Sequence, residues 1–133
     1  MNERYERGLA RQAELGGPGD TRTEVYNGLA AIAPDLHRLA VEFAYGDIHA
    51  RPGLDAARRE LVVIGCLIAL GGVEPQLDAH LASALGAGVR PSELVEAIMQ
   101  AIPYAGFPRA MGALNVACRF FERNNINLEG QHK

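Results

Sequence analysis

Hydrophobic and polar positions follow a helical period along nearly the whole chain. The pattern predicts helices over residues 3–15, 21–32, 34–46, 56–70, 75–86, 91–103 and 108–123. Apolar residues recur three and four positions apart in these segments, as Leu36, Leu39 and Phe43 do, and this spacing places them on one helix face. No repeat or change of composition divides the chain. We therefore expect one domain over residues 1–133, with a core at about 5–123 and a polar, frayed tail at 124–133.

Capping and breaking residues set the expected ends of these helices. Asp55 is a good N-cap for the helix over 56–70, and Gly71-Gly72 is expected to stop it. Gly46 is expected to end or bend the third helix. Pro103 removes a backbone donor, so it is expected to kink or end the sixth helix.

The helix over 56–70 is apolar on all sides after Glu60. A buried strand would suit the β-branched residues at 61–64, but the length and the polar start favour a helix. A helix of this kind is the buried centre of a bundle or of an oligomer. The sequence therefore predicts an all-α, single-domain bundle of about six to seven helices that forms a homo-oligomer.

Composition narrows the classes of function. The chain of 133 residues has a net charge of -3 and a pI near 5.8, with no basic block to neutralise phosphates, so a nucleic-acid partner is not expected. The longest apolar run, residues 61–73, contains three glycines and is too short to span a bilayer. The N-terminus has no apolar signal region. We expect a cytoplasmic protein without a membrane partner.

Cys66 and Cys118 are far apart and lie in apolar stretches. They are expected to be buried, reduced thiols that pack as small hydrophobic groups, and not a disulfide. No two His or Cys residues have the spacing of zinc ligands, so no metal site is expected.

Candidate chemistry gathers in residues 45–55 and at His80. The segment contains His49, Arg51 and a rigid Pro-Gly turn, and it precedes the most apolar part of the chain. Glu60 stands at the edge of that apolar run, where burial can shift the pKa of a carboxyl group. Each group also has a structural interpretation. His80 can be a core histidine bonded to a backbone carbonyl, and Glu60 a solvated carboxylate at the helix start.

Several short motifs stand out along the chain. They are Gly-Asp-Ile at 46–48 with Arg-Pro-Gly-Leu-Asp at 51–55, Leu-Asp-Ala-His-Leu at 77–81, and Gln100, Tyr104, Gly106 and Pro108. Together they resemble motifs of the γ-carboxymuconolactone decarboxylases. The resemblance runs from about Tyr5 to Phe121, and the segments at 46–48 and 51–55 are its specific part.

The helical hairpin with a histidine belongs to a wider superfamily that includes alkylhydroperoxidase-like proteins. Its peroxidase branch has a Cys-x-x-Cys pair where this chain has Val73 and Gln76, so thiol peroxidase activity is not expected. Glu60 and His80 match the glutamate and histidine of that superfamily. His49 is a departure, because the decarboxylases commonly have tryptophan at this position, and it can change the substrate or add a proton donor.

The resemblance implies a cofactor-independent carboxy-lyase that converts 4-carboxymuconolactone to the enol-lactone and CO2 in aromatic catabolism, the β-ketoadipate pathway. His80 would donate the proton, Glu60 would orient His80, and Arg51 would grip a substrate carboxylate. His49, Tyr104 and Gln100 would line the pocket.

These assignments have alternatives. Arg51 can pair with Asp47 or Asp55, His49 can be an exposed loop residue, and Gln100 and Tyr104 can cap the helix break at Pro103. The whole chain can also serve another proton transfer on a small acid or lactone, or be a non-enzymatic oligomeric binding protein. Similar proteins commonly form trimers or hexamers.

Overall fold

The computed structural model describes residues 2–128, and all regular structure in this part of the chain is helical. This confirms the predicted all-α fold. None of the helices in this range is long and apolar enough to cross a membrane. The helices are α1 (Glu3–Glu14), α2 (Arg22–Asn27), α3 (Leu36–Leu39), the π-helix η1 (Ala40–His49), α4 (Ala56–Leu70), α5 (Glu74–Gly86), α6 (Pro91–Ala105) and α7 (Phe107–Arg123).

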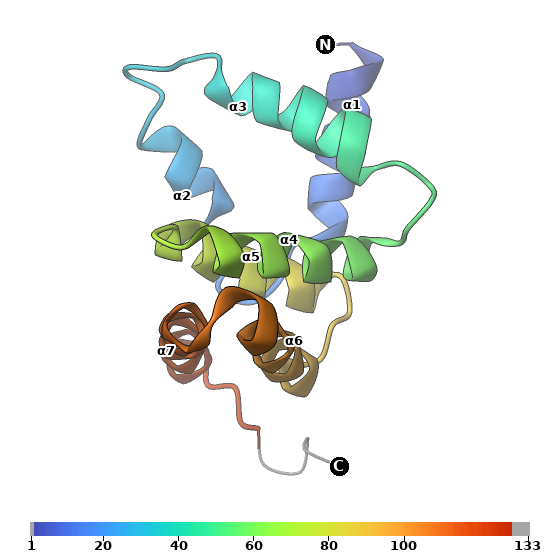
Figure 1. Ribbon diagram of the computed structural model, residues 1–133. Helices are drawn as coiled ribbons and strands as arrows, with labels where there is room; N and C mark the ends of the chain where they lie inside the picture. Colours follow the sequence, from blue (N-terminus) through green and yellow to red (C-terminus); the bar gives the residue numbers. More distant parts are fainter. Residues whose placement is uncertain (1, 129–133) are drawn as a thin grey trace.

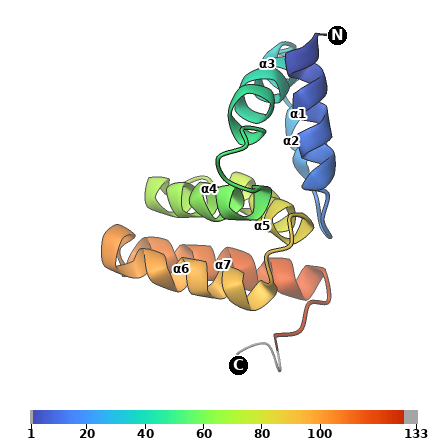
Figure 2. The same ribbon diagram turned by 90° about the vertical axis from the view of Figure 1, so that its right-hand side faces the viewer.

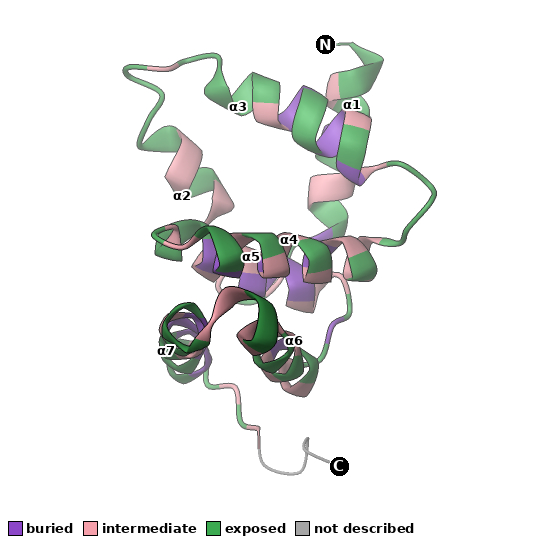
Figure 3. Ribbon diagram, in the orientation of Figure 1, coloured by how far each residue is buried: buried purple, intermediate pink, exposed green. Residues whose placement is uncertain are grey.

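The helices lie in layers. α6 and α7 lie side by side, α4 and α5 form the next layer, and α1, α2 and the continuous α3–η1 helix lie on the other side of α4 and α5 (Figures 1 and 2). The main hydrophobic core lies among α4 to α7, where Ile64, Leu81, Leu94, Ile98 and Phe120 are fully buried (Figure 3). The N-terminal helices pack mainly on one another, α1 against η1, and reach α4 and α5 at few positions, among them the contact of His49 with Glu60.

The ends of α4 confirm the sequence prediction. The Asp55 side chain accepts a hydrogen bond from the backbone N–H of Arg58 at 2.8 Å, and Gly71 ends the helix with φ of 71°. Only one face of α4 is buried within the chain. Val62 and Leu70 on the other side are 57% and 64% exposed.

Neither Gly46 nor Pro103 ends its helix. η1 passes through Gly46 and ends at His49, and α6 passes through Pro103 and ends at Ala105. Gly46 does not terminate the helix but allows α1 to pack closely against it. Pro103 lies in the last turn of α6, where the donor that it lacks affects the helix little before it ends.

Two glycines let α1 and η1 approach each other closely. A Cβ on Gly8 would collide with the backbone of Val41, and a Cβ on Gly46 would collide with the carbonyl oxygen of Arg4. The Arg4 guanidinium also grips both oxygens of Asp47, at 3.0 Å from Nε and 2.7 Å from Nη2. The contact fixes η1, and hence His49 at its end, against α1.

The tail and the cysteines differ from the prediction. Residues 124–128 are not frayed. The backbone N–H of Ile126 donates to Phe121 at 2.9 Å, and Ile126 and Leu128 pack on the core; residues 129–133 lie outside the described part. Cys66 and Cys118 are free thiols but are exposed and not buried, because they lie on the outward faces of α4 and α7.

Candidate active site

One buried carboxylate lies at the centre of the site. Glu60 follows the capped first turn of α4 and is fully buried beneath η1. Its Oε2 atom is 2.6 Å from Nε2 of His49, and its Oε1 atom is 2.8 Å from Nδ1 of His80. The three predicted residues therefore come together from η1, α4 and α5. Glu60 is not the solvated carboxylate of the alternative interpretation, and His80 bonds to this carboxylate and not to a backbone carbonyl.

Arg11 fixes the proton on His49. Its Nη1 atom is 3.1 Å from Nδ1 of His49 and also donates to the His49 backbone carbonyl. Because a guanidinium only donates, Nδ1 of His49 must accept, and the hydrogen of a neutral imidazole is then on Nε2, which donates to Glu60. The chain Arg11–His49–Glu60 thus has a single consistent direction of hydrogen bonding.

His80 is oriented by the same carboxylate. Its Nδ1 atom donates to Glu60, and its Nε2 atom has no hydrogen-bond partner anywhere in residues 2–128. The side chain is 22% exposed. Nε2 can therefore accept a proton from a ligand or, when protonated, donate one to it.

Glu60 is ionised in this arrangement. Burial raises the pKa of this carboxyl group, but the hydrogen bonds from His49 and His80 together lower it more, so the net pKa lies below its ordinary value. The carboxylate can then stabilise a positive charge on His80 when its Nε2 atom carries a proton. This is the arrangement of a histidine acid–base group with an orienting carboxylate.

His80 and His49 line a cavity of about 360 Å³. Its walls are mostly apolar and come from η1, α4 and the turn between them, with Tyr26 from α2. The lining residues are Tyr26, Ala44, Tyr45, Ile48, His49, Leu54, Arg59, Val62, Val63 and His80. A cavity with apolar walls and a few polar groups is typical of a small-molecule site.

The other three predicted residues lie elsewhere. Arg51 is exposed, and its backbone carbonyl accepts a hydrogen bond from Arg59 at 2.9 Å. Gln100 and Tyr104 line a separate cavity between α4 and α6. Within one chain, the structure does not bring these three side chains to His80.

Several residues of the site were missed by sequence reasoning. Tyr45 is buried and stacks on His49, with ring centroids 5.7 Å apart, and the Arg22 guanidinium also lies over the Tyr45 ring, 5.5 Å from its centre. Arg59 takes the place at the cavity that Arg51 was expected to occupy. Tyr45 and His49 are four residues apart on η1, a spacing that places them on a shared face, but the sequence pattern predicted a helix that ends or bends at Gly46, between them. Arg22 has no such signal, because α2 meets the site only in the folded chain.

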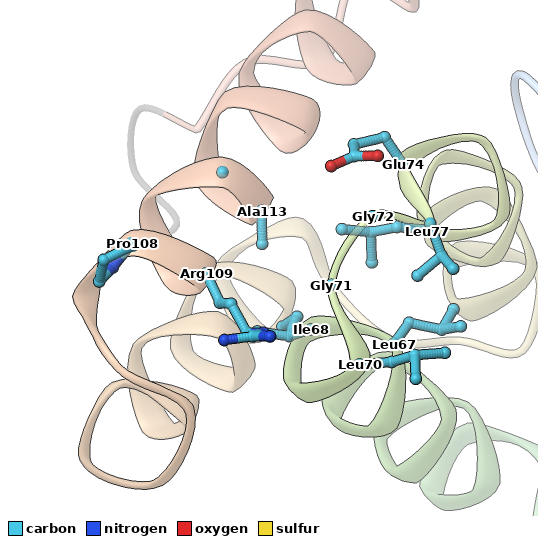
Figure 4. Close-up of a pocket in the computed structure, with 12 residues that line it drawn as sticks. Leu67, Ile68, Leu70, Gly71, Gly72, Glu74, Leu77, Pro108, Arg109 and Ala113 are labelled. Carbon is cyan, nitrogen blue, oxygen red and sulfur yellow. The ribbon is translucent and has the colours of Figure 1, made fainter.

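A further cavity of about 380 Å³ lies between the end of α4, the start of α5 and α7 (Figure 4). Glu74 and Arg109 line it, but none of His49, Glu60 and His80 does. In the part of the chain from residue 2 to 128, no group of three or more His, Cys, Asp or Glu residues is arranged to hold a metal ion. The acid–base chemistry is thus concentrated at the first cavity.

Known proteins resemble this chain over most of its length. A 4-carboxymuconolactone decarboxylase from Acinetobacter baylyi is 34% identical over 131 residues, which cover 98% of this chain and 96% of that protein. A nitrosuccinic acid decarboxylase from Metarhizium robertsii is 32% identical over 95 residues, or 71% of this chain and 64% of that protein. An uncharacterized 15.0 kDa protein from Paracoccus denitrificans is 34% identical over 87 residues, 65% of each chain. Residues 34–118 match the family described as the Carboxymuconolactone decarboxylase family, and the chain belongs to this family.

Proposed function

We propose that this protein is a cofactor-independent carboxy-lyase of aromatic catabolism that decarboxylates a carboxylated unsaturated lactone of the 4-carboxymuconolactone type. Two relatives named as decarboxylases support the general activity. The relative that covers nearly the whole chain supports the lactone as substrate. The observation that carries the proposal is His80, which is held by a buried carboxylate with its second nitrogen unpartnered at an apolar cavity.

The reaction needs no external electron acceptor. The bond between the ring carbon and its carboxylate breaks, CO2 leaves, and the electron pair moves through the C=C bond into the lactone carbonyl. Nε2 of His80 then delivers a proton to carbon, and water replaces that proton on the imidazole. The protein must hold the substrate, stabilise the developing enolate oxygen and supply this proton.

The apolar walls assist the loss of CO2. A carboxylate in this cavity exchanges its water shell for the side chains of Ile48, Val62 and Val63, whereas neutral CO2 loses little there. Glu60 stabilises the imidazolium before proton transfer, and charge interactions of this kind are stronger where water is excluded. The apolar walls and Glu60 therefore both stabilise the transition state more than the bound substrate.

The test is CO2 release from freshly prepared 4-carboxymuconolactone by the purified protein. Release well above the spontaneous rate supports the lyase. The relative that is named for nitrosuccinic acid makes a small acid without a lactone ring the second candidate substrate. Nitrosuccinate in the same assay distinguishes the two. Failure of both substrates to release CO2 rejects the lyase proposal.

We also propose that the protein works as a homo-oligomer, a trimer or hexamer. Large apolar side chains remain exposed on one chain, among them Val62, Leu70, Phe107 and Met111. Exposed groups of this kind mark association surfaces. Sedimentation equilibrium gives the subunit number directly, and a monomer at micromolar concentration would reject the proposal.

A further inference from the structure

A second, smaller cavity is also lined by His80. It has a volume of about 160 Å³, and it shares Tyr26, Tyr45 and His80 with the larger cavity. Arg22 and Ser83 add polar groups that the larger cavity lacks. The space is enough for several water molecules or for a short carboxylate-bearing arm of a ligand.

Arg22 is held rigidly at this cavity. Its side chain is only 12% exposed. Nη1 donates to the carbonyl of Gln12 at 3.2 Å, Nη2 donates to Oγ of Ser83 at 3.1 Å, and the guanidinium lies 5.5 Å from the centre of the Tyr45 ring. A guanidinium has more N–H donors than these two bonds use, so further donors remain for a ligand.

Tyr45 provides a second, independent observation. The residue is 5% exposed and lines both cavities, yet its hydroxyl makes no hydrogen bond to any residue from 2 to 128. The hydroxyl oxygen itself is not sealed from solvent, so it faces the open space of the cavities, where it can donate to a ligand or to water. Burial raises the pKa of Tyr45, so the hydroxyl stays neutral and remains a donor.

The charges around Arg22 leave room for an anion. Asp20 is the nearest carboxylate, with Oδ2 at 3.7 Å, and its side chain is 31% exposed, so water screens it. Arg59 at the larger cavity also makes two hydrogen bonds, from Nε to the carbonyl of Leu54 and from Nη2 to that of Arg51, but these are exposed to solvent, whereas the two bonds of Arg22 are partly buried. Water therefore screens the charge of Arg22 less, and its attraction for a carboxylate is stronger.

We propose that the smaller cavity is a carboxylate-binding subsite, in which Arg22 and the Tyr45 hydroxyl hold the carboxylate that a substrate keeps. A second carboxylate of the same molecule then lies in the apolar cavity, which His80 also lines, and is the one lost. The assignment of which carboxylate is lost rests on the proposed decarboxylation. The anion site itself does not, and Arg22 becomes the residue that selects dicarboxylates over monocarboxylates.

The test compares succinate with butanoate by isothermal titration calorimetry. Both probes have four carbons, and they differ in one carboxylate. The wild-type protein should bind succinate more tightly. Arg22→Met should weaken succinate binding about 10–100-fold, as expected for loss of hydrogen bonds to a charged group, while butanoate changes little. Arg109→Met is the matched control, because Arg109 is exposed at a different cavity.

Tyr45→Phe gives a second test that does not depend on Arg22, because it removes one oxygen atom and keeps the ring. Succinate binding should weaken about 3–10-fold. Equal affinity of the wild type for the two probes overturns the subsite. So does an unchanged preference for succinate in folded Arg22→Met and Tyr45→Phe.

The outcomes also separate this inference from the proposed function. If the protein binds dicarboxylates through Arg22 but releases no CO2, the lyase proposal is rejected and the subsite proposal stands. Turnover with the same KM in the wild type and Arg22→Met rejects the subsite and keeps the lyase. The two proposals can therefore fail independently.

Discussion

Replacing Glu60 with glutamine tests the hydrogen-bond network at its centre. The substitution keeps the shape of the side chain but changes one acceptor oxygen into an NH2 donor. His49 must donate to position 60, because Arg11 occupies its other nitrogen. The amide oxygen therefore faces His49, and the NH2 group faces Nδ1 of His80.

This arrangement changes the chemistry of His80. To accept a hydrogen bond at Nδ1, the ring must carry its hydrogen on Nε2, and Nδ1 can no longer take up a proton without losing that bond. The variant cannot form the imidazolium that a carboxylate stabilises. We therefore expect kcat to fall by about 10²–10⁴-fold, the usual contribution of a general acid–base group.

The effect on stability is smaller and depends on pH. Two hydrogen bonds to a buried charge become neutral ones, a loss of about 1 kcal/mol each that relief of the buried charge partly offsets. The pKa of Glu60 is below its ordinary value of 4.5, so its stabilising contribution is complete above pH 4.5 and is lost as pH falls through the lower pKa of the folded state. The difference in unfolding free energy between wild type and variant should shrink in that range.

The assays are steady-state CO2 release and urea unfolding followed by far-UV circular dichroism at pH 7 and pH 4. Glu74→Gln is the matched control, because Glu74 is an exposed carboxylate at a separate cavity. A folded Glu60→Gln protein that keeps kcat within about threefold of the wild type would refute the reasoning.

Three further predictions follow from the packing and from Arg11. Gly46→Ala should lower the free energy of unfolding by about 1–3 kcal/mol in urea titrations, because its methyl group meets the Arg4 carbonyl. Gly65 lies in open space, so Gly65→Ala should leave the free energy of unfolding nearly unchanged or raise it. Equal effects of the two substitutions would contradict the account. Hydrogen bonds from Arg4 lower the pKa of Asp47 below its ordinary 3.8, so Asp47→Asn should destabilise the protein at pH 7. The difference in unfolding free energy should shrink as pH falls below 3.8 through the lower pKa of the folded state, and a constant difference would argue against the ion pair. Arg11→Met frees His49 to change tautomer, so kcat should fall about tenfold while KM stays nearly constant, and the pH–rate profile should shift. An unaltered pH–rate profile would show that Arg11 does not belong to the hydrogen-bond network.

Local sequence signals predicted the helices well. Asp55 and Gly71 set the ends of α4 through capping and backbone geometry, which depend on neighbouring residues alone. Gly46 misled the prediction because its role is a contact with α1, 42 residues earlier in the chain. The cysteines misled it for a related reason: an apolar segment does not show which of its faces meets the core.

The site was predicted only in part, because contacts between segments distant in sequence leave no local signal. The resemblance identified Glu60 and His80, the composition of residues 45–55 identified His49, and the fold brings the three within hydrogen-bond distance. Arg11 and Arg22 come from helices far away in sequence, and no spacing rule connects them to a histidine. Their contribution follows only from the packing of α1 and α2 against η1 and α5.

The most direct test of the central claim is turnover by His80→Ala. The account predicts that the folded variant, with its oligomeric state unchanged, releases CO2 from 4-carboxymuconolactone about 10²–10⁴-fold more slowly than the wild type, and that added imidazole restores part of the rate. Turnover equal to that of the wild type would contradict the account, because no other described group at the cavity is placed to deliver the proton from an unpartnered nitrogen.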